Sequence, residues 1–222
     1  MNTNKLRQLS TSLARQFPAV AALLLCAGFA TAQGLRNADG LGLPPLPGAT
    51  TQPGQAAAAR SGPPAASLDT LMAWERQDMG VPASRQLHDG APHGPTPNQI
   101  PGGQVITTKG LLPLLQQREV PVRVFDVLGA AQGLPQAIPA AWAAQPGRFD
   151  DETQSRLAQL LRQASGGRRD VALVFYCGGP QCWMSYNAAL RAIQLGYPNV
   201  MWYRGGMEAW QRAGQALSGA AG

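Results

Sequence analysis

A continuous apolar run, Val171-Ala-Leu-Val-Phe-Tyr176, stands in the C-terminal half of the chain. A run of this length without polar alternation is typical of a strand that is buried on both faces of a parallel sheet. Shorter runs that are rich in β-branched and aromatic residues predict further strands at 104–108, 122–128 and 199–203. The pattern therefore predicts four strands, with 171–176 as the central one.

Leucines at helical spacing separate these strands. Leu157, Leu160, Leu161 and Ala164 follow the i, i+3, i+4, i+7 pattern and predict a helix over 151–164. Acidic residues at its start favour the helix N-terminus. Further helices are predicted over 67–78, from Thr108 onward, over 185–195 and over 207–213.

The expected helix ends carry residues that suit them. Ser67, Thr108 and Ser185 are placed to cap three of the helices, and Gly196 is a usual terminator. Strands that alternate with helices in this order predict an α/β fold with a central, mostly parallel sheet.

Residues 1–32 have the layout of a secretory signal peptide. A basic start is followed by an apolar run over 17–30 and by the small residues Ala30-Thr31-Ala32. The run of 14 residues is too short to span a bilayer comfortably, although an uncleaved anchor is the alternative. We therefore expect a periplasmic or secreted protein without a membrane span after cleavage. Cys26 is expected to be removed with this segment.

Composition divides the rest of the chain into segments. A Pro-, Gly- and Ala-rich stretch predicts a disordered linker over 33–66, because it cannot bury enough apolar surface to offset the entropy of ordering. A short helix and an irregular lead-in are expected over 67–103. The folded domain is expected over 104–214, and a flexible tail over 215–222.

Charge and metal-ligand spacing exclude two classes of function. The net charge is +6, but the chain after residue 32 holds 15 basic and 12 acidic side chains without a basic cluster, so nucleic-acid binding is not expected. His88 and His93 lie among turn residues without nearby cysteines or acids. We expect neither a metal site nor a cofactor.

The chemistry is concentrated in the loop 177–184, Cys-Gly-Gly-Pro-Gln-Cys-Trp-Met. Cys177 follows the central strand, at the sheet edge where α/β proteins bind ligands. Gly178 and Gly179 allow a tight curl, in which backbone amides and the next helix N-terminus favour an anion. The same field lowers the pKa of a thiol, so Cys177 is the candidate nucleophile. Cys182 is near enough to be a resolving thiol or a structural disulfide partner.

Several motifs of the C-terminal part resemble the end of a rhodanese homology domain. They are Phe175-Tyr-Cys177, Asn187-Ala-Ala-Leu-Arg191, Gly196-Tyr-Pro-Asn-Val200, and Tyr203-Arg-Gly-Gly206 with Trp210. Pro95-Thr-Pro97, Pro101-Gly-Gly103 and Cys182-Trp183 are similar to an exported bacterial group with a Cys-x-x-Cys-Trp motif. That group is named for its association with pyrroloquinoline quinone-dependent catabolism. Here four residues, rather than two, separate the cysteines.

The resemblance implies a three-layer rhodanese-like domain that carries sulfane sulfur as a persulfide on Cys177, with Cys182 as a resolving thiol. The substrate would be a small anionic sulfur donor or a thiol, and an exported quinoprotein dehydrogenase or cytochrome would be the partner. The substrate-binding residues are expected to be Gly178, Gly179, Gln181, Trp183, Met184 and Ser185.

Two other functions fit the same residues. In a thiol–disulfide oxidoreductase, Cys177 would attack and Cys182 would resolve. In a noncatalytic binding module, the pair would be a disulfide that staples the loop. Near this loop, Asp126 is expected to orient backbone, and Arg204 is expected to have an ordinary surface role.

Overall fold

The structure, a computed structural model, describes residues 65–117 and 120–219. The predicted signal peptide, 1–32, and nearly all of the predicted linker lie outside the described residues. Within them, no helix has the length and the apolar character that crossing a membrane requires.

The centre of the fold is a five-stranded sheet in which every neighbouring pair is parallel. The strands, in spatial order, are β1 (Gln104–Val105), β6 (Val200–Tyr203), β5 (Ala172–Tyr176), β2 (Val122–Asp126) and β4 (Ile138–Pro139). All five residues of β5 are buried, as its uninterrupted apolar run predicts. The α/β prediction is thus confirmed, with β5 as the central strand.

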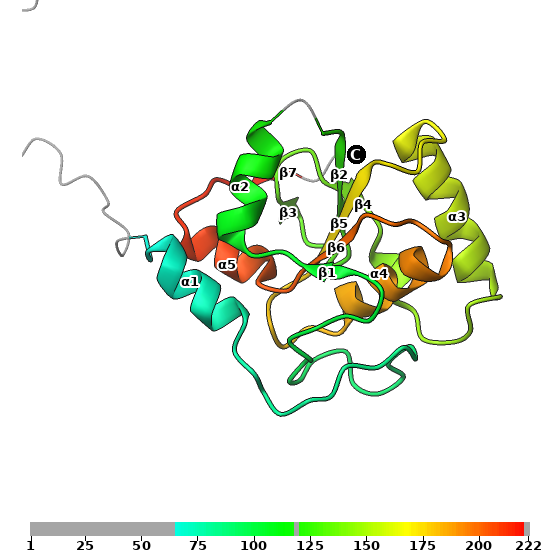
Figure 1. Ribbon diagram of the computed structural model, residues 1–222, viewed down its shortest axis with the longest axis horizontal. Coiled ribbons are helices and arrows are strands. Elements are labelled where there is room, and N and C mark those ends of the chain that lie inside the picture. The colour runs from blue at the N-terminus through cyan, green and yellow to red at the C-terminus, as the bar shows by residue number, and fades with distance from the viewer. Residues whose placement is uncertain (1–64, 118–119, 220–222) are drawn as a thin grey trace, which may run out of the picture. The chain divides into compact units, whose positions relative to one another are not determined.

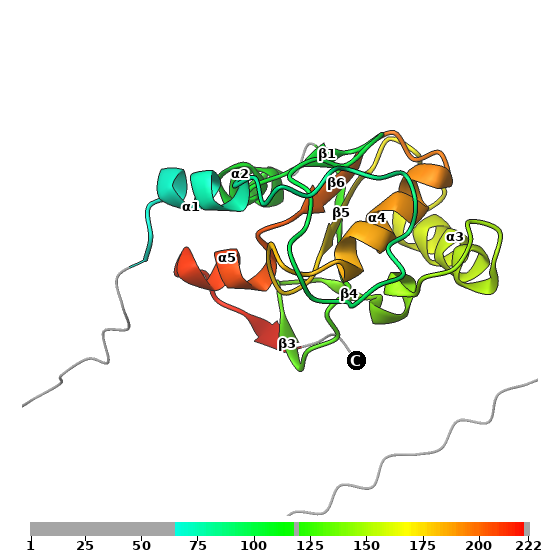
Figure 2. The same cartoon turned by 90° about the horizontal axis from the view of Figure 1, so that it is seen from below.

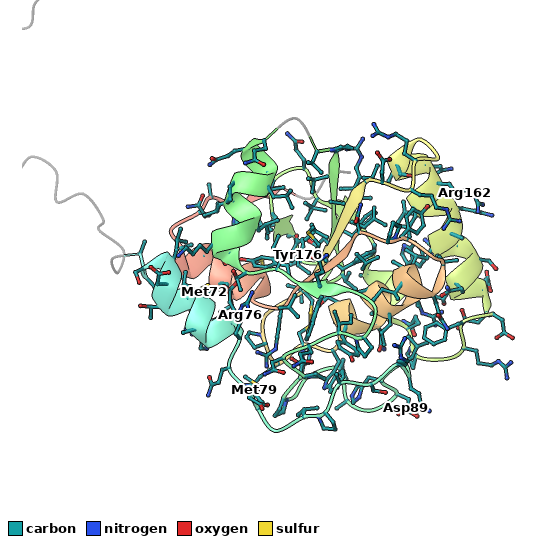
Figure 3. All side chains as sticks on the ribbon, in the orientation of Figure 1. Met72, Arg76, Met79, Asp89, Arg162 and Tyr176 are labelled. Atoms are coloured by element: carbon teal, nitrogen blue, oxygen red, sulfur yellow. A yellow bond between two sulfur atoms is a disulfide. The ribbon has the colours of Figure 1, made fainter. Side chains whose placement is uncertain are left out.

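Helices cover both faces of the sheet, which gives three layers (Figures 1 and 2). One face is covered by α1 (Leu68–Glu75), α2 (Thr108–Gln116) and α5 (Gly206–Arg212). The other is covered by α3 (Glu152–Ser165), α4 (Met184–Gln194) and the 3-10 helix η1 (Ala141–Ala144). Side chains alternate along β5 between the two resulting cores: Phe175 packs on the α4 side, and Val174 and Tyr176 pack on the other. Tyr176 lies near the middle of the domain (Figure 3).

A second, two-stranded sheet pairs β3 (Gln132–Gly133) with β7 (Ser218–Gly219) in antiparallel fashion. The two residues of β7 fall within 215–222, the range expected as a flexible tail. Their pairing places this part of the C-terminal segment against the loop that follows β2.

The first two helices begin differently. Ser67 caps α1 as predicted, because its Oγ accepts a hydrogen bond from Thr70 N at 3.1 Å. The prediction that Thr108 caps α2 is wrong: Thr108 is the first residue of the helix, and its amide donates to the buried Glu75 carboxylate at 2.9 and 3.1 Å. Burial raises the pKa of this carboxyl group.

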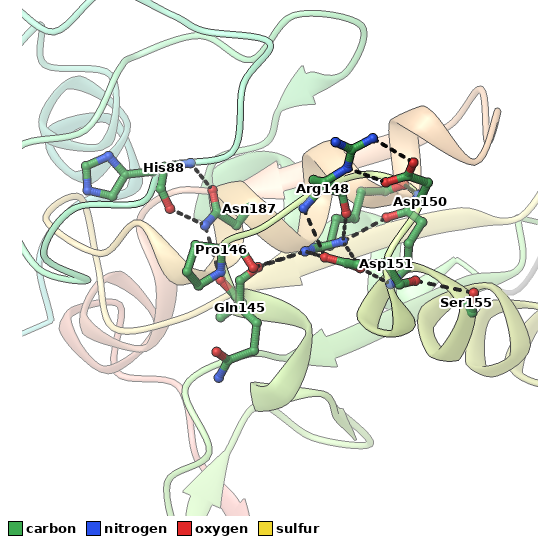
Figure 4. Close-up of polar contacts among 11 residues, drawn as sticks. His88, Gln145, Pro146, Arg148, Asp150, Asp151, Ser155 and Asn187 are labelled. Carbon is green, nitrogen blue, oxygen red and sulfur yellow. Dashed lines mark hydrogen bonds and ion pairs between the residues drawn. The ribbon is translucent and has the colours of Figure 1, made fainter.

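A buried ion pair joins α4 to the start of α3 (Figure 4). The fully buried Arg191 guanidinium donates to both carboxylate oxygens of Asp151, at 2.9 and 2.8 Å. It also donates to the Gln145 and Arg148 carbonyls, at 3.0 and 2.9 Å. Asp151 in turn caps α3 by accepting from Gln154 N at 2.8 Å. The hydrogen bond from Arg191 lowers the pKa of Asp151 to about 2.

Candidate functional site

The cysteine loop, residues 177–184, begins where β5 ends, as the apolar run predicts. Cys177 and Cys182 form a disulfide, with their Cα atoms 6.3 Å apart. Cys177 is 1% exposed and Cys182 is 3% exposed, so neither sulfur faces open solvent. The structure therefore shows the oxidised pair, and Cys177 can be a nucleophile only after the disulfide is reduced.

The N-terminus of α5 holds the first residues of the loop. The Met207 and Glu208 amides donate to the Cys177 and Gly178 carbonyls, both at 2.9 Å. Gly206 makes this approach possible: its φ is +58°, and a Cβ there would collide with the Cys177 carbonyl oxygen. The positive end of α5 is thus already occupied by loop carbonyls.

Two amides of the cysteine loop bond to carbonyls rather than facing its centre. Cys182 N donates to Gly179 O at 3.1 Å, and Trp183 N donates to Pro92 O at 3.0 Å. The cradle that the sequence predicts for an anion is therefore only partly formed in this oxidised state.

Ser185 does not cap α4, contrary to the prediction from the sequence. The N-cap residue is Trp183, and Ser185 lies in the first turn of the helix with 1% exposure. Its hydroxyl oxygen lies 3.0 Å from Cys177 Sγ and accepts a hydrogen bond from Trp202 Nε1 at 3.0 Å. The hydroxyl thus faces the disulfide instead of the helix amides.

Residues 92–96, called the strap below, lie against the cysteine loop on the lower side of the domain in Figure 1. The contacts are the antiparallel bridge of His93 with Cys182 and the hydrogen bonds Gly94 N to Gln181 O (2.9 Å), Trp183 N to Pro92 O (3.0 Å) and Thr96 Oγ1 to Pro180 O (2.6 Å). The predicted irregular lead-in therefore includes a segment that packs on the backbone of the cysteine loop.

Buried polar side chains anchor the C-terminal end of the strap, at Thr96, and the lead-in just before the strap, at His88. Arg204 donates from Nε to Thr96 Oγ1 and from Nη2 to Thr96 O, each at 3.0 Å. Asn187 accepts from His88 N at 2.7 Å and donates to His88 O at 2.8 Å. The expected surface role of Arg204 is wrong, since its side chain is 1% exposed and burial lowers its pKa. Because both sulfurs are buried, a reagent can reach them only if a segment packed around the cysteine loop moves, and the strap is one such segment.

The strap gives a testable expectation. Thr96→Val removes the hydroxyl that joins Arg204 Nε to Pro180 O and leaves both groups unpaired. Opening should then need less free energy, so a small thiol should reduce the disulfide about tenfold faster than in wild type. Thr107→Val is the matched control, because Thr107 is also buried but its side chain makes no cap hydrogen bond. Equal reduction rates in the two variants would show that the strap does not limit access.

Trp183 and Met184 line a cavity of about 260 Å³ beside the loop, together with His88 and Asn187. The Trp183 ring stacks on His88, with the ring centroids 4.0 Å apart and the planes 8° from parallel. Its edge meets Tyr186 at 5.2 Å. The Trp183 ring therefore packs between the lead-in and α4, and the cavity lies next to the helix end that carries Ser185.

Asp126 orients backbone, as expected. Its Oδ1 accepts from Leu128 N and Gly129 N at 2.8 and 3.0 Å, and its Oδ2 accepts from Tyr176 OH at 2.7 Å. Burial, followed by the hydrogen bond to Asp126, raises the pKa of Tyr176 above its ordinary value. Asp126 thus holds the backbone of the loop after β2 and the side chain of Tyr176, the residue before Cys177.

The other expected substrate-binding residues are spread around the loop. Gly178 is half-buried, Gly179 is buried and Gln181 is exposed. No sequence pattern pointed to Thr96, whose side chain contacts the cysteine loop, or to Trp202, whose side chain contacts Ser185. Their roles depend on contacts between segments far apart in the chain.

Residues 113–213 match the family model of the rhodanese-like domain. The matched range is a little less than half of the chain, and over this range the chain is similar to a rhodanese-like domain. Such a domain suggests a function of the sulfurtransferase type or a related one. The range that matches the family model begins after the strap, so the strap belongs to the lead-in. No curated protein matches the chain significantly.

Solved structures resemble the chain only distantly. A protein from Bacillus halodurans has 23% identity and a TM-score of 0.40, over 52% of this chain and 77% of its own. A protein from Rhodopseudomonas palustris, described as of unknown function and a possible tyrosine phosphatase, has 20% identity and a TM-score of 0.36, over 52% and 84%. The anaerobic ergothioneine biosynthesis enzyme from Chlorobium limicola has 17% identity and a TM-score of 0.39, over 58% and 35%.

Proposed function

We propose that the protein is an exported sulfurtransferase-type protein that takes sulfane sulfur from a small anionic donor onto Cys177 and returns to a Cys177–Cys182 disulfide. The observation that supports this most is the disulfide itself, formed at the carboxyl end of β5 within a rhodanese-like domain. The disulfide joins Cys177, the expected nucleophile, to Cys182, whose thiol can complete a reaction that begins at Cys177.

The cycle begins with the reduction of the disulfide by two equivalents of an external thiol, which become a disulfide. The Cys177 thiolate then attacks the outer sulfur of a donor such as thiosulfate. The bond between the two donor sulfurs breaks, and sulfite leaves with the bonding electrons. Cys177 now carries a persulfide, which is the form in which the domain holds sulfane sulfur.

Cys182 completes the cycle. Its thiolate attacks Cys177 Sγ, forms the disulfide seen here, and displaces the outer sulfur as sulfide, which takes up a proton. The net reaction converts thiosulfate and two thiols into sulfite, hydrogen sulfide and one disulfide. In this scheme, both cysteines react, and the oxidised pair is the resting state of the protein.

Export and a partner belong to the same proposal. The signal-like residues 1–32 support a periplasmic or secreted location, where disulfides persist. The resemblance of Cys182-Trp183 and the preceding proline motifs to the group associated with pyrroloquinoline quinone supports a role beside an exported quinoprotein dehydrogenase or cytochrome. N-terminal sequencing of the mature protein tests the first point.

The test of the cycle uses fully reduced protein, freed of reductant and mixed with one equivalent of thiosulfate. We expect released sulfide and sulfite, and a protein whose intact mass is two hydrogens below that of the reduced form. An unchanged reduced mass without sulfide would refute the transfer step. A persulfide that stays on wild-type protein would refute the role of Cys182.

A binding module is the second candidate, and the burial of both sulfurs beneath the anchored strap favours it. In that case the disulfide would staple the loop and would resist mild reductants. Readily reversible reduction, followed by reaction with thiosulfate, separates the sulfurtransferase from this alternative.

A further inference from the structure

The strap pairs with the cysteine loop as a short antiparallel ribbon, in which His93 lies opposite Cys182. Two backbone hydrogen bonds flank this pair: Gly94 N to Gln181 O (2.9 Å) and Trp183 N to Pro92 O (3.0 Å). Because these bonds flank the pair and do not join its two members, His93 and Cys182 form the closer kind of antiparallel pair. In such a pair the Cα atoms are about 4.5 Å apart and the side chains lie on the same face of the ribbon.

This pairing suits a disulfide between Cys182 and a cysteine that takes the position of His93. A disulfide needs Cα atoms about 4.4–6.8 Å apart, and this range includes the spacing of the closer antiparallel pair. Since the strap pairs with Cys182 and not with Cys177, a thiol carried on the same ribbon would reach Cys182 first.

The part of the strap that forms the ribbon is held by few contacts. Its two hydrogen bonds join backbone groups only, and three of its residues are exposed: Pro92, His93 and Pro95. Buried side chains fix the chain on either side, Asn187 at His88 and Arg204 at Thr96, so a movement can be confined to 89–95. An extended peptide in the same place would replace both lost hydrogen bonds, so the exchange is close to balanced in free energy.

We propose that the strap occupies the binding site of an extended, cysteine-bearing segment of a partner protein, and that this segment is the thiol that reduces the disulfide. The cysteine of the partner takes the place of His93, and its backbone bonds to Gln181 O and Trp183 N. The inference rests on the proposed function for the later reaction of Cys177. It adds the chemical class of the reductant and the sulfur that the reductant attacks.

The reduction proceeds in two exchange steps. The thiolate of the partner attacks Cys182 Sγ, the bond between Cys182 and Cys177 breaks, and Cys177 leaves as a thiolate with the bonding electrons. A second thiolate then attacks the sulfur of the partner in the mixed disulfide, which forms the external disulfide and releases Cys182 as a thiolate. Two external thiols are oxidised to one disulfide, and the protein disulfide is reduced to two thiols. Cys177 is thus the first sulfur to be freed for reaction with a donor.

The experiment treats the oxidised protein with a five-residue synthetic peptide, in which one cysteine is flanked on each side by valine and threonine. The rate at which the peptide adduct appears in the intact mass should saturate with peptide concentration. A second peptide, with proline directly after the cysteine, lacks the amide that would bond Gln181 O. Its rate at low concentration should be about tenfold lower. Acid quenching, alkylation and peptide mapping should place the peptide on Cys182 and the alkyl group on Cys177.

Gly94→Pro tests the competition between the strap and the peptide, because it removes the amide that the strap donates to Gln181 O. It should lower the half-saturating concentration of the cysteine peptide about fivefold. Gly80→Pro is the matched control outside the strap. Both glycines have positive φ, +73° at Gly80 and +150° at Gly94, and open space around the position of a Cβ. The Gly80 amide also donates one hydrogen bond, to Asp78 Oδ1 at 2.9 Å.

Three results would each overturn the inference. They are equal rates for the two peptides, a peptide that maps to Cys177, and the same half-saturating concentration in Gly94→Pro and Gly80→Pro. If the peptides behave as expected but reduced wild type does not react with thiosulfate, the proposed function fails and the binding of the cysteine-bearing segment stands.

Discussion

Asp151→Asn is expected to lower the free energy of unfolding by about 3 kcal/mol, because it leaves the Arg191 charge buried without a counterion. The Arg191 side chain has no exposed surface, while that of Asp151 is 27% exposed. Asparagine is also a good helix N-cap, so the cap of α3 is kept and the loss reports the missing charge. Urea unfolding at neutral pH measures the change.

The neighbouring pair supplies the control. Asp150 bonds Arg148 in the same view of Figure 4, but both side chains are mostly exposed, at 68% and 81%. Asp150→Asn should therefore leave stability almost unchanged. If the Asp150 and Asp151 variants unfold at the same urea concentration, the pair of Arg191 and Asp151 does not hold the helices together.

The same ion pair has a pH signature. The pKa of Asp151 falls from 3.8 to about 2 in the folded protein, so its contribution to stability is fully present above the higher value and is lost as the pH falls through the lower one. The difference between wild type and Asp151→Asn should therefore shrink on acidification below pH 4.

Cys177→Ser is expected to abolish the release of sulfide from thiosulfate, because the variant lacks the thiol at the end of β5 and leaves Cys182 without a partner thiol that could displace sulfide. The variant should still fold, since the loop is also held by α5 and by the strap. Ser165→Ala, at a buried serine of α3, is the control, and should react as wild type does. Sulfide release that survives in Cys177→Ser would show that the nucleophile lies elsewhere.

The fold follows from local patterns that the sequence shows directly. The apolar run 171–176 predicts a central buried strand, and the leucine spacing over 151–164 predicts α3 almost to its ends. The first signal arises because β5 faces a core on both sides, and the second because α3 turns one face toward a core. These patterns can be recognised without any knowledge of distant contacts, so the position of Cys177 at the end of β5 could also be predicted.

The details of the site depend on distant contacts and could not be predicted. Arg204 and Thr96 are 108 positions apart, and Trp202 meets Ser185 across 17 positions. The strap binds the cysteine loop mainly through backbone groups, which leave no side-chain signature. Ser185 looked like a cap because small hydroxyl residues favour helix N-termini, yet the buried sulfur and indole take its hydroxyl instead.

The spacing of the cysteines allowed both a disulfide and a pair of free thiols, because five positions on a curled loop suffice for either. The structure places the pair in a disulfide beneath the strap. Reduction of the buried disulfide is therefore the first step of any reaction at Cys177.

The most direct test of the central claim is the intact mass of the reduced Cys182→Ser protein after treatment with thiosulfate. Cys177 should accept one sulfur atom, and the persulfide should accumulate because no second thiol displaces it. A stable gain of one sulfur, mapped to Cys177, is the predicted result. A mass that stays at the reduced value, while a small disulfide or an alkylating reagent still reacts with the same thiol, would contradict the account.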